Sequence, residues 1–134
     1  SNYVGETVDM AVDMGAKGIL FVAHLGKFVK VAGGIMNTHS RSANARAELM
    51  AANAIRAGAS LETAKQILDT VTTDEAVQIA KKAGILRGLM QEITIRIEES
   101  LNHRSYGRLV CGAVIFSNEH GYLGQTEHAD MLMK

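Results

Sequence analysis

The sequence predicts a single α/β domain over residues 1–134, helix-rich and layered on a small, mainly parallel sheet. Segments with helical spacing of apolar residues alternate with two short apolar runs, 18–23 and 109–116, which are typical of buried parallel strands. At 47% apolar content, the chain can build one core. Because two or three strands make a poor sheet among six helices, we expect the sheet to be incomplete without an N-terminal partner region.

The N-terminal part is predicted to run from helix to strand to helix. Helical spacing over 3–14 ends at Gly15, a residue that readily terminates a helix in the left-handed conformation. The apolar strand 18–23 follows, and we expect both of its faces to be covered. Helical spacing resumes over 25–32, whereas 35–40 has no clear period and is predicted to be a loop.

The middle of the chain is predicted to be helical. Ser42 is the expected N-cap of a helix over 43–57, and Ser60 that of a shorter one. Thr72-Thr73-Asp74-Glu75 fits the capping box that begins a third. A long amphipathic helix over 86–104 is predicted by one apolar face, made of Leu86, Leu89, Met90, Ile93, Ile97 and Leu101.

The C-terminal part is predicted to be a strand over 109–116, a turn over 117–121 and a third strand over 122–126. Cys111, inside the apolar strand, is interpreted as an inert core thiol. His120 in the turn and His128 near the end are expected to be solvated.

Composition excludes several classes of function. Lys plus Arg and Asp plus Glu number 14 each, so no basic field favours nucleic acid, and we predict no nucleic-acid partner. One cysteine cannot form an internal disulfide. We find no signal peptide and no apolar run long enough for a membrane span, so we expect a cytoplasmic protein with no membrane partner. The G-x-G-x-x-G, P-loop and G-x-S-x-G motifs are absent.

Polar residues gather just beyond the first predicted strand. In α/β sheets, ligands bind at the carboxyl ends of strands, where helix N-termini present free N–H groups. His24, Gly26 and Lys27 fall at this position, which favours an anionic ligand. A polar cluster, Asn37, Thr38, His39, Ser40 and Arg41, follows. It either joins this site or only turns the chain and caps the next helix, and both interpretations stay open.

No metal site is predicted, because no third Cys or acidic partner has ligand spacing with His24 and His39.

Residues 1–54, and above all the pattern H-x-G-K-x-x-K…G-x-x-N-T-H-S that runs from His24 to Ser40, resemble the C-terminal region of the CbiD family of anaerobic cobalamin biosynthesis. Ala23 stands in place of the small residue that the family usually has before this histidine. The resemblance is weaker through the helices and returns at VIFSNEHGYLG, residues 114–124. Members of the family are much longer, so we expect this chain to be the C-terminal part of an enzyme that needs its N-terminal region.

The resemblance implies S-adenosylmethionine-dependent C-methylation of a cobalt-containing tetrapyrrole, cobalt-precorrin-5B, giving cobalt-precorrin-6A. The substrate carries many carboxylate arms, for which Lys27, Lys30 and Arg41 are the implied anchors. His39 and His24 are the implied catalytic residues, as proton acceptors or hydrogen-bond partners. The further substrate-binding residues implied are Gly26, Asn37, Thr38 and Ser40.

Two other classes of function remain as alternatives: a non-catalytic binding module for an anionic metabolite, and a structural half-domain that completes another sheet. We expect the chain by itself to be inactive and to present an apolar docking surface. A homo-oligomer is a further expected arrangement.

Overall fold

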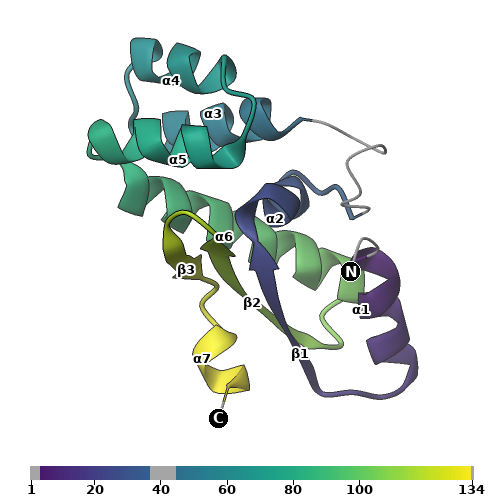
Figure 1. The fold of residues 1–134 in the computed structure, drawn as a ribbon. Coiled ribbons are helices and arrows are strands. Elements are labelled where there is room, and N and C mark those ends of the chain that lie inside the picture. Colours follow the sequence, from purple (N-terminus) through teal and green to yellow (C-terminus); the bar gives the residue numbers. More distant parts are fainter. Residues whose placement is uncertain (1–3, 37–44, 134) are drawn as a thin grey trace.

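The structure is a computed structural model that describes residues 4–36 and 45–133. Within these residues it has seven helices and one three-stranded sheet (Figure 1). The elements in chain order are α1 Val4–Asp13, β1 Gly18–His24, α2 Leu25–Ala32, α3 Arg46–Arg56, α4 Leu61–Leu68, α5 Thr73–Lys82, α6 Leu86–Ser105, β2 Val110–Ser117, β3 Gly121–Gln125 and α7 Ala129–Leu132. No helix of these two described ranges is both long and apolar enough to cross a membrane.

The predicted helices are confirmed, and the short α7 is an addition. Gly15 has φ +72°, as expected for a left-handed helix end. The predicted cap Ser42 lies outside the described residues. Where the structure resumes, α3 begins at Arg46, and Ala45 at its N-cap position makes no side-chain cap hydrogen bond.

The sheet has the order β1-β2-β3 and is mixed. β1 and β2 are parallel, in a register that runs from Gly18 opposite Val110 to His24 opposite Phe116. β2 and β3 form an antiparallel hairpin. The carboxyl ends of β1 and β2 therefore lie side by side at the same edge of the sheet.

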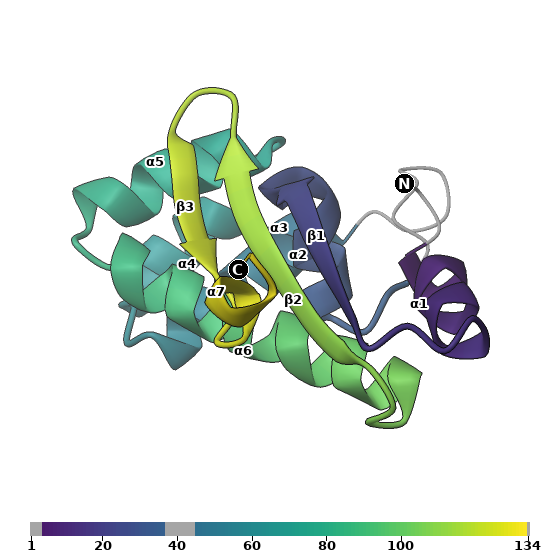
Figure 2. The same ribbon diagram turned by 90° about the horizontal axis from the view of Figure 1, so that it is seen from below.

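The two faces of the sheet are covered unequally, as Figure 2 shows. α2 and α6 pack on one face, where Phe21 of β1 lies against Phe28 of α2 with ring centroids 5.3 Å apart. Among the described residues, α7 is the helix that packs on the other face, and a Cβ built on Gly18 would meet its Leu132 side chain. Val22 points to this face beyond α7 and is 67% exposed. The expectation that both faces of β1 are covered is therefore wrong, because a helix of four residues cannot span a strand of seven.

Helices α3, α4 and α5 form a group that packs on α6, away from the sheet (Figure 1). The capping box predicted at α5 is confirmed: Thr72 Oγ1 accepts from the Glu75 N–H at 3.2 Å, and Glu75 Oε1 accepts from the Thr72 N–H at 3.0 Å. These hydrogen bonds lower the pKa of the Glu75 carboxyl. They also fix the start of α5, which borders the site described next.

Candidate functional site at the carboxyl end of the parallel strands

The site is built where β1 and β2 end. β1 ends at His24 and α2 starts at the next residue, so the chain turns directly from the strand into a helix N-terminus. The His24 ring meets the ring of Phe116 in β2 edge to face, with centroids 5.8 Å apart. This contact holds the imidazole at the sheet edge between the two strands.

His24 is the N-cap of α2, a role that the sequence did not predict. Its Nδ1 accepts a hydrogen bond from the Gly26 backbone N–H at 2.9 Å. Since Nδ1 is the acceptor, a neutral His24 ring carries its proton on Nε2. The residue can then donate a hydrogen bond to a ligand through its Nε2–H, but it can accept a proton only at Nδ1, which would break the cap.

Gly26 is surrounded by polar atoms of three other elements. A Cβ built on it would lie 3.2 Å from His24 Nδ1, 3.4 Å from Thr73 Oγ1 and 3.6 Å from Arg46 Nη1. A side chain there would crowd the cap, so the bare glycine is what permits the N-termini of α2, α3 and α5 to meet. This convergence of helix N-termini favours negative charge.

Lys30 and Arg46 place two cationic side chains beside this meeting point. Lys30 is buried, with 1% exposed. Burial and then the charge of Arg46 lower the pKa of its ammonium. The Arg46 Nε is also enclosed and has no hydrogen-bond partner among the described residues. An anion bound here would relieve the repulsion between the two charges and accept from the guanidinium.

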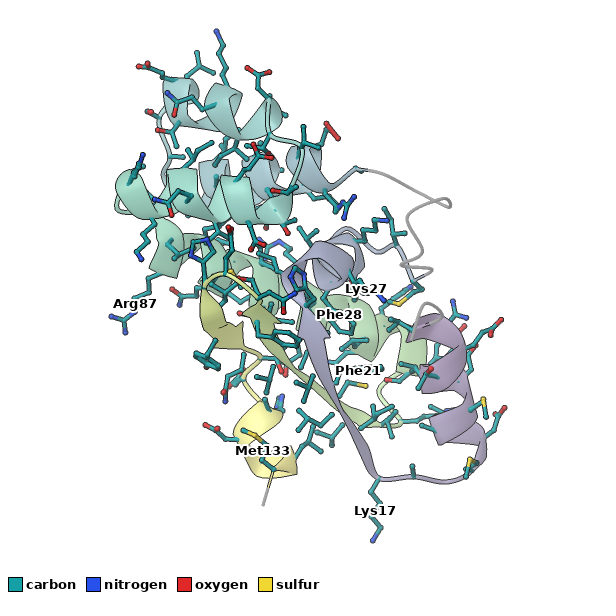
Figure 3. The ribbon with its side chains drawn as sticks, in the orientation of Figure 1. Lys17, Phe21, Lys27, Phe28, Arg87 and Met133 are labelled. Carbon is teal, nitrogen blue, oxygen red and sulfur yellow. The ribbon has the colours of Figure 1, made fainter. Side chains whose placement is uncertain are left out.

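Of the predicted site residues, the structure describes four and brings them to one place. Lys27, in the first turn of α2, is exposed (Figure 3), whereas Lys30, one turn further on, is buried. The two predicted lysine anchors therefore differ in their access to a ligand. The remaining predictions, for Asn37, Thr38, His39, Ser40 and Arg41, fall outside the described residues and stay predictions.

The structure adds residues that the sequence reasoning missed. His120 was expected to be solvated, and this is wrong: its side chain is only 14% exposed, because the turn after β2 folds against the start of α5. Asp74 and Glu119 lie with it, and an open cavity of about 520 Å³ adjoins the three. The available signal was the position of residues 118–120 just beyond the second parallel strand, the same placement that singled out His24.

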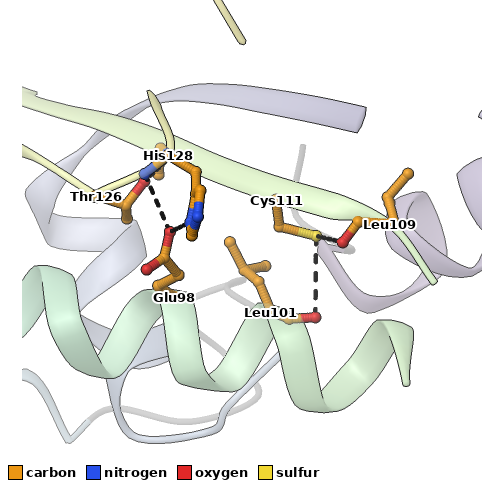
Figure 4. A network of polar contacts seen from close by, with 7 residues as sticks. Glu98, Leu101, Leu109, Cys111, Thr126 and His128 are labelled. Carbon is orange, nitrogen blue, oxygen red and sulfur yellow. Dashed lines mark hydrogen bonds and ion pairs between the residues drawn. The ribbon is translucent and has the colours of Figure 1, made fainter. Parts of the chain in front are cut away.

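The opposite, amino end of the parallel strands also carries polar groups, but there they are paired with one another. Arg104 donates two hydrogen bonds to the Asp9 carboxylate, at 3.0 and 2.8 Å, and this pairing lowers the pKa of Asp9. His128 Nδ1 lies 2.7 Å from Glu98 Oε1, the contact drawn in Figure 4. Cys111 Sγ lies 3.6 Å from the Leu109 carbonyl oxygen, and burial raises the pKa of this thiol, as predicted for an inert core position.

Residues 37–127 match a family model described as the C-terminal domain of CbiD. The chain belongs to the CbiD family. The resemblance predicted from the His24–Ser40 pattern is therefore confirmed, and the match extends it through α3 to β3. No solved structure matches this CbiD chain significantly.

Curated relatives of this CbiD chain carry the name cobalt-precorrin-5B C(1)-methyltransferase. That of Alkaliphilus metalliredigens is 38% identical over the whole chain, which corresponds to 35% of the relative. That of Ruminiclostridium cellulolyticum is 42% identical over 88% of the chain and 31% of the relative. That of Clostridioides difficile is 35% identical over the whole chain and 33% of the relative. The chain thus spans about a third of the length of these relatives.

Proposed function

We propose that this chain works as part of a longer methyltransferase that C-methylates cobalt-precorrin-5B in anaerobic cobalamin biosynthesis, and that its carboxyl-end site binds the carboxylate arms of the substrate. The names of the relatives support the reaction. The proposal includes the remaining two thirds of the enzyme as the partner of this chain, S-adenosylmethionine as methyl donor, and a location in the cytoplasm.

The observation that carries the binding role is the placement of Lys30 and Arg46 beside the start of α2. Their charges are close enough for Arg46 to lower the pKa of Lys30, and the Arg46 Nε is enclosed without a hydrogen-bond partner among the described residues. A substrate carboxylate in this place would accept from the guanidinium and favour the charged form of Lys30. Lys27, exposed in the first turn of α2, is the proposed anchor for a second carboxylate arm.

The two histidines are proposed to have different roles. His24 uses Nδ1 to cap α2, so its Nε2–H is available to donate to the macrocycle or to one of its carboxylates. Methylation of a ring carbon leaves positive charge on the macrocycle, and a proton is lost afterwards. His39 is the proposed acceptor of that proton.

S-adenosylmethionine supplies an electrophilic methyl group when bound. Lys30 and Arg46 do not fit its sulfonium, because they carry the same sign of charge. We therefore assign them to the substrate. Correct positioning of the two reactants can contribute about 7–11 kcal/mol to lowering the barrier of such a transfer.

Binding of a cobalt corrinoid polycarboxylate to the full-length enzyme tests this proposal by isothermal titration calorimetry. Lys30→Met fills the same volume without a charge and should weaken binding by roughly 1.5–3 kcal/mol, the usual value of a hydrogen bond to a charged group. Lys27→Ala should weaken it less. Lys17, at the opposite end of β1 (Figure 3), provides the control Lys17→Ala, which should bind like the parent.

Unchanged affinity in both Lys30→Met and Lys27→Ala would refute the assignment of the substrate to this end of the sheet. If Lys30→Met fails to fold, Lys27→Ala at the exposed lysine still tests the assignment. Titration of the isolated chain with S-adenosylhomocysteine and the corrinoid separates the other classes of function. A binding module would bind the corrinoid alone with full affinity, and a structural half-domain would bind neither. Sedimentation of the isolated chain tests whether it forms a homo-oligomer.

A further inference from the structure

We propose that Asp74, Glu119 and His120 form a binding site for a divalent transition-metal ion at the carboxyl end of β2. One ligand atom from each residue lies within 4.8 Å of the ligand atoms of the other two. A cavity of about 520 Å³ adjoins the cluster and leaves room for further ligands on the ion. The inference rests on residues other than those that carry the proposed substrate site, so either can fail alone.

Two of the three ligands are held by separate, rigid parts of the fold. Asp74 is the second residue of α5, whose first turn is fixed by the capping box between Thr72 and Glu75. His120 lies in the turn between β2 and β3, and its backbone N–H donates to the buried Ser117 Oγ at 2.9 Å. Because the fold brings these two elements together, the cluster is positioned before any ion arrives.

The third ligand can adjust. Glu119 is 69% exposed, and its Oε2 lies 3.8 Å from His120 Nε2. Ligand atoms around a transition metal lie about 2.0–2.2 Å from the ion and so within roughly 4.4 Å of each other. The Glu119–His120 distance is already within this limit, and the exposed Glu119 side chain can rotate toward an ion.

Independent support comes from polar atoms whose bonding is incomplete. Asp74 Oδ1 and His120 Nε2 are both enclosed, and neither has a hydrogen-bond partner among the described residues. The position of Asp74 near a helix N-terminus explains its charge, but not the missing partner of its enclosed oxygen. A cation between the two residues would satisfy both atoms and would also separate the negative charges of Asp74 and Glu119.

The donor set indicates the class of ion. Ca²⁺ and Mg²⁺ prefer oxygen ligands throughout, whereas an imidazole with two carboxylates suits Zn²⁺, Co²⁺ and related ions. Three protein ligands beside a cavity leave at least one coordination position for water or another ligand, as in open metal sites.

A second cluster of the same residue types provides an internal comparison. Glu98, Glu127 and His128 also place their ligand atoms within 4.8 Å of one another. There, however, His128 Nδ1 is already bonded to Glu98 at 2.7 Å, and the same carboxylate accepts from the His128 backbone N–H at 3.2 Å. Binding of a metal through these atoms would have to displace those bonds, so we expect the ion to select the His120 cluster.

Titration of the metal-free full-length protein with CoCl₂, followed by visible absorption and calorimetry, tests the proposal. We expect one saturable site with the spectrum of Co²⁺ bound to nitrogen and oxygen, and its displacement by ZnCl₂. His120→Ala should weaken binding by more than about 10-fold, since loss of even an indirect partner of a metal ligand costs 10–100-fold. Asp74→Asn should act in the same direction, and His128→Ala should leave the affinity unchanged.

Absence of a saturable spectrum, or binding lost in His128→Ala and retained in His120→Ala, would overturn the assignment. If His120→Ala fails to fold, Asp74→Asn and Glu119→Gln, which keep the size of the side chains, decide the question. Full metal affinity in both would count against the site. Because the readout is binding of the metal alone, it does not depend on methyl transfer.

Discussion

The two ends of the β1–β2 pair contain similar polar residues in opposite states of bonding. At the amino end, Arg104 and Asp9 share two hydrogen bonds, and His128 is bonded to Glu98. At the carboxyl end, the described structure leaves Arg46 Nε, Asp74 Oδ1 and His120 Nε2 enclosed without hydrogen-bond partners. Enclosed polar groups are costly when unpaired, so these atoms indicate where the fold is suited to accept another molecule or ion.

Residues of the same type have different bonding at the two ends. A histidine beside carboxylates occurs at both ends: His128 is bonded to Glu98, which raises its pKa, whereas His120 Nε2 has no hydrogen-bond partner among the described residues. At the amino end, the two residues of each pair are bonded to each other, so their role is best explained as structural. The three predictions below test this contrast, from the largest expected effect to the smallest.

The largest effect is expected for the thiol of Cys111 at the amino end. Its side chain is buried and its pKa is raised by burial, so labelling requires the strand to open. Opening equilibria of small domains are about 10³ or more in favour of the closed state, and we expect labelling by a thiol reagent to be slower by at least that factor than in urea. Rapid stoichiometric labelling of the folded chain would show that this end is open, against the contrast.

A smaller but still large effect is expected for His39, the proposed acceptor of the proton. In the full-length enzyme, His39→Ala should lower kcat by roughly 10²–10⁴-fold, the usual contribution of a general base, with less effect on substrate binding. The control is His103→Ala, an exposed histidine of α6 near the amino end, which should leave kcat unchanged. Equal kcat in the two variants would remove His39 from the mechanism, and a lowered melting temperature would indicate a structural role.

The smallest effect is expected for the exposed pair of His128 and Glu98. Because Glu98 raises the pKa of His128 above 6.5, the charged pair stabilises the fold fully at low pH, and the contribution is lost as the pH rises through the raised pKa. His128→Ala should therefore lower the melting temperature more at about pH 5.5 than at about pH 8.5. A difference that grows with pH would mean that the pair does not stabilise the fold.

The sequence predicted most of the fold because most helices and strands carry a local signal. Apolar spacing defined α1, α2 and α6, and the Thr72 capping box located the start of α5. The coverage of β1 was not predictable in this way. It depends on α7, which is too short to show a period, and on how far α7 extends along the strand. An apolar run identifies a strand but does not show what packs on each face.

The residues of the candidate site also differ in whether a local sequence signal could predict them. His24, Gly26 and Lys27 could be predicted because they follow one strand directly in the sequence. Arg46 and His120 could not, because they reach the site from α3 and from the β2–β3 turn through tertiary packing. Asp74 was missed for another reason: the capping box already gave its segment a sufficient local explanation, which hid a second role for the same helix start.

The pairing of β1 with β2 has a consequence for how the chain folds. β1 precedes α2 and β2 follows α6, so the two strands meet only after the whole helical region between them has been brought into place. Contacts between distant parts of a chain form slowly, because closing a long loop costs entropy before the contact repays it. We therefore expect the α3–α5 group and the β2–β3 hairpin, which are local in sequence, to form first. The carboxyl-end site then assembles in the last step, when β1 joins the edge of the sheet.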